Sequence, residues 1–284
     1  MDQQPVNPLS KHFRQPAIYM KLPSGGRFWP EGSIDLPMNL EIPVYPMTAR
    51  DEITIRTPDA LMNGQGIVDI IKSCCPNITD PWKMPSIDVD SVLLHIRIAS
   101  YGNNMDFDTT CPKCNDESSF TLNISNLTSQ ITMPNYDQIL GIDGLQIKLK
   151  PQPYFEVNRV NQLSFTEQQI LRTINDATLS DEDKKAKSDN YLRKLVDLNI
   201  DISVNSTQSI TTEDGTVVTN PIFIKEFYNF ADFKVIKKIQ TRLQEINQEA
   251  DLKPIDTKCT NESCGHEYSI PLSFDYSNFF DQGF

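Results

Sequence analysis

Histidine is scarce in this sequence. The 284 residues include only three, His12, His95 and His266, and these lie far apart along the chain. A catalytic zinc usually takes histidine ligands and keeps one position open for water. The sequence therefore supplies such a centre poorly.

Basic residues are also in the minority. The chain carries 26 Lys and Arg against 38 Asp and Glu, a formal net charge of −12. An anion of this size repels phosphate backbones unless it presents a local basic face. Generic nucleic-acid binding is therefore disfavoured.

Long apolar runs are missing as well. No run approaches the ~20 residues of a membrane span, and the start Met1-Asp2-Gln3-Gln4-Pro5 lacks the basic and apolar pattern of a secretion signal. We therefore expect a reducing compartment, where close cysteine pairs indicate metal ligands before disulfides. A hydrophobic fraction of 38% fits a globular chain rather than a disordered one.

The positions of turn-forming residues and the spacing of apolar residues predict an α+β fold. Helical spacing covers 88–101, 155–173 and 180–198, and one further apolar stripe runs from Asn220-Pro221 to Ile246. Alternation predicts strands at 40–44 and 145–149 and a β-hairpin within 202–218. Helix starts are expected at Thr48 and Pro58. The expected segments are an N-terminal arm (1–17), an α+β region with a first cysteine knuckle (18–144), a helix-rich insert with a hairpin (145–250), and a second knuckle with an aromatic tail (251–284).

Two cysteine pairs carry the strongest chemical signal. Cys111 and Cys114 stand before one alternating segment, and Cys259 and Cys264 before another. A tetrahedral zinc takes four thiolates, and a tight turn can bring two sulfurs to one metal. The pattern predicts a zinc-ribbon-like hairpin pair holding one structural zinc. Four cysteines close the coordination shell, which leaves no water for catalysis.

The second pair departs from the usual spacing. Four residues separate Cys259 from Cys264, so His266 is an alternative fourth ligand. The two pairs are 144 residues apart, and closing so long a loop costs roughly 4 kcal/mol. A structural zinc contributes ~10–16 kcal/mol, so the metal outweighs the loop. Reduced cysteines that merely pack together, a disulfide and a reactive site remain alternatives.

Several short motifs occur in a characteristic order. They are Lys21-Leu22-Pro23-Ser24-Gly25-Gly26-Arg27-Phe28-Trp29-Pro30, Pro46-Met47-Thr48-Ala49-Arg50-Asp51-Glu52, Pro58-Asp59-Ala60-Leu61-Met62-Asn63-Gly64, Arg97-Ile98-Ala99-Ser100-Tyr101-Gly102, the Cys111/Cys114 knuckle, Cys264-Gly265-His266 and Phe274-Asp275-Tyr276-Ser277-Asn278-Phe279-Phe280. Together they resemble the baseplate hub subunit family of T-even-type contractile-tailed phages. The resemblance covers roughly 18–125 and 222–284.

The resemblance implies a non-enzymatic protein of the virion tail baseplate. Such a protein is assembled in the host cytoplasm, either as a permanent component or as an assembly factor. Its partners would be other baseplate and hub proteins, without a membrane or direct nucleic-acid contact. The acidic composition and the closed cysteine set agree with this role.

Aromatic residues near both chain ends are candidates for docking to partners, because exposed rings are costly in water and useful as anchors. The alternative is that the C-terminal tail folds back onto the chain's own core. The candidates are Phe13, Tyr19, Phe274, Tyr276, Phe279, Phe280 and Phe284.

Two other functions compete. A zinc-ribbon nucleic-acid-binding or transcription accessory protein needs a basic face, whereas acidic residues outnumber Lys113 and Lys258 around the knuckles. A metallohydrolase needs a general base and an open metal position, and no His-Glu-x-x-His sequence provides them.

Overall fold

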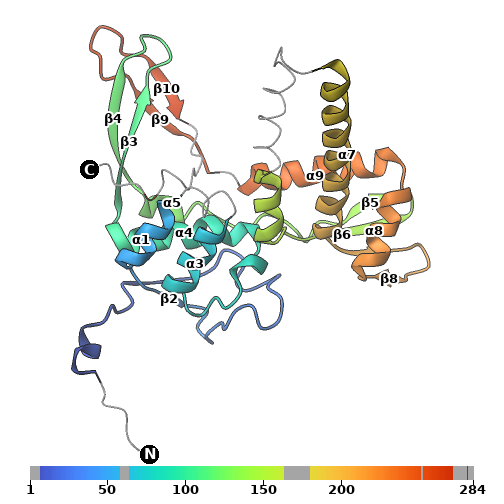
Figure 1. Ribbon diagram of the computed structural model, residues 1–284, viewed down its shortest axis with the longest axis horizontal. Helices are drawn as coiled ribbons and strands as arrows, with labels where there is room; N and C mark the ends of the chain where they lie inside the picture. The colour runs from blue at the N-terminus through green and yellow to red at the C-terminus, as the bar shows by residue number, and fades with distance from the viewer. Residues whose placement is uncertain (1–6, 58–63, 163–179, 251, 271–279, 281–284) are drawn as a thin grey trace, which may run out of the picture.

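The computed structural model describes residues 7–57, 64–162, 180–250, 252–270 and 280. The fold is mixed α+β, as the sequence predicted, with helices, small antiparallel sheets and two hydrophobic cores. Figure 1 shows the helices α1, α3 and α4 below a pair of tall hairpins, and α7, α8 and α9 on the opposite side.

The first core lies among short strands and helices from the N-terminal half. Strands β1 and β2 pair antiparallel, with Tyr19 opposite Pro43. Ile42 and Val44 of β2 are fully buried against α3 and α4. The elements around this core are η1 (Pro8–His12), β1 (Ile18–Met20), β2 (Ile42–Val44), α1 (Ala49–Ile55), α3 (Gln65–Cys74), η2 (Pro81–Lys83), α4 (Ser86–Tyr101) and α5 (Ser125–Thr128).

Local signals fix the ends of these helices. The Thr48 hydroxyl accepts from the Asp51 N–H, and the Asp51 carboxylate accepts from the Thr48 N–H, which forms a capping box at the start of α1. Helix α4 buries Val89, Val92 and Ile96 and stops before Gly102, whose φ of 86° favours glycine. The start predicted at Pro58 lies outside the described residues.

A buried carboxylate pins an N-terminal loop to α4. Asp88 accepts hydrogen bonds from the Ser24 N–H at 2.9 Å, the Ser24 hydroxyl at 2.6 Å and the Trp29 indole N–H at 2.7 Å. These donors lie 64 and 59 residues away in the chain. Burial raises the pKa of Asp88 to about 6, although the hydrogen bonds from Ser24 and Trp29 oppose that shift.

The second core is built on a four-stranded antiparallel sheet of order β5-β6-β7-β8. Ile147 and Ile210 face each other across β6 and β7 and are buried with residues of α8 and α9. The elements are β5 (Leu140–Ile142), β6 (Leu145–Leu149), helical residues 154–162, α7 (Asp181–Asn205), β7 (Thr207–Thr211), β8 (Val217–Val218), α8 (Pro221–Phe230) and α9 (Phe233–Ala250).

Two predicted elements differ from the structure. Helix α7 continues to Asn205, with Leu198 and Val204 buried, so the following hairpin begins at Thr207. The apolar stripe after Asn220 belongs to two helices, α8 and α9. The break falls at residues 231–232, where the Asp232 carboxylate caps α9 by accepting from the Lys234 N–H.

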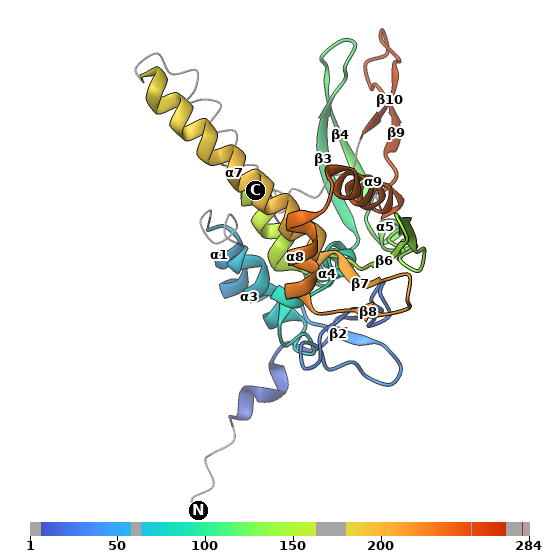
Figure 2. The ribbon, with the colours of Figure 1, turned by 90° about the vertical axis from the view of Figure 1, so that its right-hand side faces the viewer.

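The two cysteine hairpins stand side by side above the first core. Figures 1 and 2 show β3 (Asn104–Thr110) with β4 (Glu117–Asn123) next to β9 (Ile255–Lys258) with β10 (Glu267–Ile270). Burial alternates along each strand, so every hairpin has one polar exposed face and one half-buried face. The Ser118 and Thr260 hydroxyls join the hairpins at 2.6 Å.

Candidate metal centre

The first cysteine pair occupies the turn between β3 and β4. Thr110 and Glu117 are the last paired residues, and the Cys111 N–H donates to the Asp116 carbonyl at 2.9 Å. The Asn115 N–H donates to the Cys111 carbonyl, also at 2.9 Å, with Asn115 in the left-handed conformation at φ 57°. This tight turn places both cysteine side chains on one side of the hairpin end.

The second pair uses a longer version of the same turn. The Cys259 N–H donates to the His266 carbonyl at 2.8 Å, which closes the strand pair as Cys111 does in the first hairpin. Gly265 takes the left-handed position, with φ 53°, and its N–H donates to the Asn261 carbonyl. The two additional residues between these cysteines therefore lie within the turn and leave the strand pairing unchanged.

The structure brings all four predicted sulfurs together. Their Sγ atoms lie within 4.8 Å of one another, with Cys111 to Cys264 at 4.0 Å and Cys114 to Cys259 at 3.5 Å. Four sulfurs held ~2.3 Å from one zinc at tetrahedral angles lie ~3.8 Å apart, so the observed separations fit a zinc ion. They are much longer than the ~2.05 Å of a disulfide, and all four cysteines are free.

The pKa values of the cluster thiols are shifted in different directions. Desolvation raises the pKa of Cys111, but hydrogen bonds from the N–H groups of Cys114 and Lys113 and from the neighbouring thiols bring it down to about 7. For Cys114, the Asp116 N–H lowers the pKa, but desolvation and contact with the other three sulfurs raise it to about 12. The close approach of the four thiols thus couples their ionisation, and a bound cation would favour the thiolate form of each.

His266 is not part of this cluster. The group of ligand atoms that the described residues bring together consists of the four cysteines. The His266 ring instead stacks on Tyr268, with ring centroids 6.2 Å apart. The described residues therefore offer four cysteines, which would close the coordination shell of a metal ion and so suit a structural rather than a catalytic site.

Comparison with known families identifies the family of this chain. The family model described as T4 bacteriophage base plate protein matches residues 16–281, which is most of the chain. The chain belongs to this family. Neither the curated proteins nor the solved structures gave a match. The match confirms the resemblance to T-even-type baseplate proteins that the sequence motifs indicated.

Family membership places this base plate protein at the phage tail baseplate. A baseplate family also suggests a non-enzyme that interacts with other baseplate proteins. Within the described part of the chain, no helix has both the length and the apolar character needed to cross a membrane.

The predicted docking aromatics have different environments in the base plate protein. The Phe13 and Tyr19 side chains are 58% and 62% exposed. Phe280 differs from the expectation of an exposed anchor: it is 2% exposed and packs in the first core, as the fold-back alternative expected. Four further candidates lie outside the described residues, namely Phe274, Tyr276, Phe279 and Phe284.

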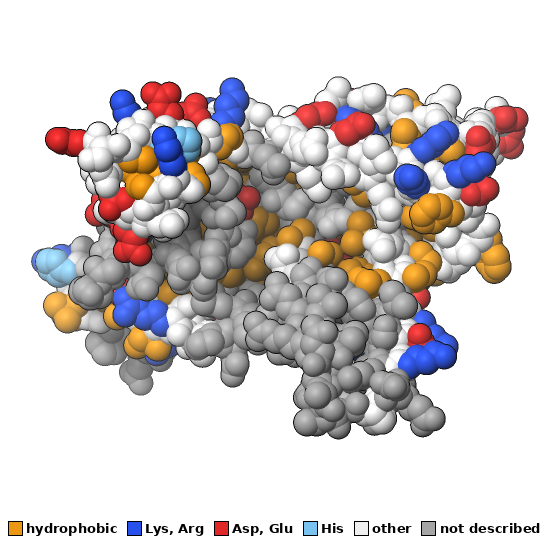
Figure 3. Space-filling view, turned by 90° about the horizontal axis from the view of Figure 1, so that it is seen from above, with side chains coloured by type: hydrophobic (Ala, Val, Ile, Leu, Met, Phe, Trp, Pro, Cys, Tyr) orange, Lys and Arg blue, Asp and Glu red, His pale blue; other side chains and the backbone are white. Residues whose placement is uncertain are grey.

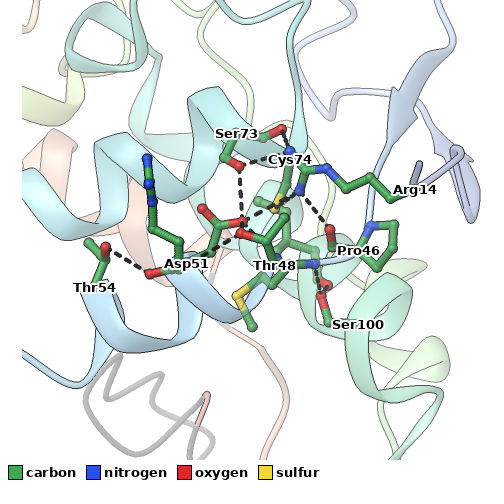
Figure 4. Close-up of polar contacts among 11 residues, drawn as sticks. Arg14, Pro46, Thr48, Asp51, Thr54, Ser73, Cys74 and Ser100 are labelled. Carbon is green, nitrogen blue, oxygen red and sulfur yellow. Dashed lines mark hydrogen bonds and ion pairs between the residues drawn. The ribbon is translucent and has the colours of Figure 1, made fainter. Parts of the chain in front are cut away.

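Sequence reasoning missed the residue that fastens the N-terminal arm. The Arg14 guanidinium donates to the Ser73 carbonyl at 2.6 Å and the Pro46 carbonyl at 2.7 Å, and it pairs with Asp51 at 3.4 Å (Figure 4). It also lies 5.8 Å from the centroid of the Tyr45 ring. Nothing in the local pattern around Arg14 indicates these contacts, because every partner is more than 30 residues away.

A third cysteine pair is chemically distinct from the cluster. Cys74 and Cys75 are fully buried in the first core. Burial raises the pKa of Cys74 to about 12, with a smaller contribution from the Asp51 carboxylate, and raises that of Cys75 as well. These thiols stay protonated at neutral pH and are poor metal ligands.

Proposed function

We propose that this chain is a non-enzymatic structural or assembly protein of a contractile phage tail, that it binds other baseplate and hub proteins, and that a structural zinc stabilises it. The observation that carries the proposal is the Cys₄ cluster within a chain matched to a baseplate family over 16–281. A closed thiolate shell holds a fold together and offers no position for a substrate.

The zinc would act as a crosslink between distant segments. Cys111 and Cys114 come from the β3–β4 turn, and Cys259 and Cys264 come from the β9–β10 turn. An isolated two-stranded hairpin is marginally stable in water. Each of these sheets has two strands, so a shared metal stabilises both and fixes their relative orientation.

The exposed arm offers a first contact with neighbours. Phe13 and Tyr19 flank Arg14, whose contacts hold the arm against α1 and α3. Two exposed rings on an anchored segment can enter a partner's pocket at little cost in chain entropy. We extend the same role to Phe274, Tyr276, Phe279 and Phe284 of the C-terminal tail.

The zinc content and the melting temperature of the purified protein test whether a structural zinc stabilises it. We expect about one equivalent of zinc in wild-type protein and less than half an equivalent in Cys111→Ser or Cys259→Ser, with a lower melting temperature. The control is Cys75→Ala, which removes a buried thiol outside the cluster and should keep its zinc. Wild-type protein with less than half an equivalent of zinc, or cluster variants with unchanged melting, contradicts this part.

A mass-spectrometric inventory of mature virions and of assembly intermediates measures the baseplate part. Presence in finished tails indicates a permanent component, and presence in intermediates alone indicates an assembly factor. Absence from both contradicts the proposal.

The charge of the hairpins disfavours the nucleic-acid alternative. The first hairpin carries Asp106, Asp108, Asp116 and Glu117 against Lys113. In the second, Asp256, Glu262 and Glu267 likewise outnumber Lys258. Phosphate contacts need clustered cations, so we expect no salt-sensitive shift of duplex DNA in a gel at low ionic strength.

A further inference from the structure

Large apolar side chains are exposed at the corner between α8 and α9. Phe230 is 86% exposed at the end of α8, and Phe233 is 72% exposed at the start of α9. Phe223, one helical stripe back from Phe230, is 58% exposed. Together the uncovered ring surface is roughly 400 Å², comparable to the largest apolar patch on a typical monomer, which is often functional.

Packing of the two helices explains why these rings remain outside. Ile224 and Tyr228 of α8 point into the second core, and Val235 and Ile239 do the same for α9. Phe223 and Phe230 lie on the flank of α8, on the same side as the half-buried Phe227. The second core is therefore complete without Phe223, Phe230 and Phe233.

Three exposed lysines follow Phe233 along α9. Lys234, Lys237 and Lys238 are exposed on the first two turns of α9. The ion pairs among the described residues include none of these three. Figure 3 shows basic, acidic and hydrophobic side chains interspersed at the right-hand end of the molecule. These lysines outnumber the two exposed carboxylates of the same corner, Glu226 and Asp232, whereas the whole chain has a net charge of −12.

We infer that the corner surface, defined as Phe223, Phe230, Phe233, Lys234, Lys237 and Lys238, docks an acidic amphipathic segment of another baseplate protein. Apolar side chains of the partner would cover the rings, and carboxylates at the rim would face the lysines. This inference rests on the proposed baseplate function and names a surface and a partner chemistry for it.

The charge of the corner surface favours an acidic protein segment over two other occupants, a second copy of this chain and an anionic membrane. A second copy docking through the same surface by two-fold symmetry would bring the lysine rows face to face, which is unfavourable. An anionic membrane would be attracted by the three lysines but repelled by a chain of net charge −12. An acidic protein segment satisfies the lysines and the rings together.

Rescue of assembly in an extract measures the contribution of the corner. Purified full-length protein is added to an extract of cells infected with phage lacking it, and infectious progeny are counted. We expect the double variant Phe230→Ser, Phe233→Ser to lower rescue about tenfold or more, as truncation of interface anchors does. Lys234→Glu with Lys238→Glu should lower rescue similarly, because reversed charges repel an acidic partner.

Matched controls separate docking from folding. Met38→Ser with Ile53→Ser removes two other highly exposed apolar side chains, and we expect rescue within about twofold of wild type. Because the corner rings lie outside the core, all variants should melt within a few degrees of wild type. Corner variants that rescue as well as wild type overturn the inference while leaving the baseplate function intact. Wild-type protein that fails to rescue contradicts the function itself.

Photo-crosslinking identifies the occupant. A benzophenone side chain in place of Phe230 should join the chain to a peptide of another baseplate protein with apolar residues and net negative charge. A crosslink to a second copy of this chain, or to a basic peptide, overturns the inference. So does flotation of wild-type protein with phosphatidylglycerol vesicles that the lysine variant loses.

Discussion

Replacing Asp88 with asparagine should give a stability effect whose size depends on pH. The carboxyl group of Asp88 is buried at the start of α4, where it accepts from the N–H and hydroxyl of Ser24 and from the indole N–H of Trp29. Burial is the main cause that raises its pKa from 3.8 to about 6. The folded state therefore binds this proton more tightly than the unfolded state does.

The sign of the pH effect follows from that difference. Stability contributed by Asp88 falls as the pH rises from about 4 through about 6, because the charged form is penalised by burial. At ~1.4 kcal/mol per pKa unit, the penalty at pH 7.5 is on the order of 3 kcal/mol. The side-chain amide introduced by Asp88→Asn has one oxygen, which can take the place of Oδ2 and accept from the Ser24 hydroxyl and the Trp29 indole. Its NH₂ group then faces the Ser24 N–H, so that donor is left unpaired at a cost of about 1–3 kcal/mol.

Urea unfolding followed by tryptophan fluorescence measures both effects. We expect Asp88→Asn to lower the free energy of unfolding by about 1–3 kcal/mol at pH 4, and by much less, or not at all, at pH 7.5. The control Asp69→Asn changes an exposed carboxylate in α3 and should stay within about 0.5 kcal/mol of wild type. A loss for Asp88→Asn that is equal or larger at pH 7.5 refutes the reasoning, because hydrogen bonding to the carboxylate would then outweigh burial.

Two further substitutions probe the packing of the N-terminal half. Arg14→Gln removes the bonds to Ser73 and Pro46, and we expect a loss of about 1–2 kcal/mol and faster proteolysis within residues 7–17; an unchanged cleavage rate contradicts the anchoring role. Gly64→Ala adds a Cβ 2.7 Å from the Asn158 side chain at φ 76°, so we expect a loss of about 1–2 kcal/mol in thermal unfolding, and a stabilised variant would contradict it.

Local patterns in the sequence were sufficient for some features. Helix α4 follows from apolar residues at helical spacing and a terminal glycine, Gly102, because both signals act within a few residues. The cysteine cluster was predicted from two closely spaced cysteine pairs, because four thiols are the set that a structural zinc takes, although the sequence left His266 as an alternative to Cys264.

Other features depend on contacts that no local pattern encodes. The split between α8 and α9 was missed because the apolar period continues across residues 231–232, although Asp232 is a recognisable cap. The end of α7 was placed too early because β-branched Ile202 and Val204 favour strands, whereas the structure has both in the last turn of the helix. Asp88 and Arg14 bind partners dozens of residues away, so their roles appear only in three dimensions.

The long sequence separation between the two cysteine pairs determines when during translation all four are available. Translation must add 150 residues after Cys114 before Cys264 exists, which takes roughly 8–30 s at ~5–20 residues per second. The nascent chain holds only Cys111 and Cys114 of the four cysteines during this interval, while the segment that builds the second core is synthesised. Under the proposed zinc role, the complete ligand set is available only after Cys264 has been synthesised, so capture of the metal by all four thiols would follow synthesis of the intervening segment.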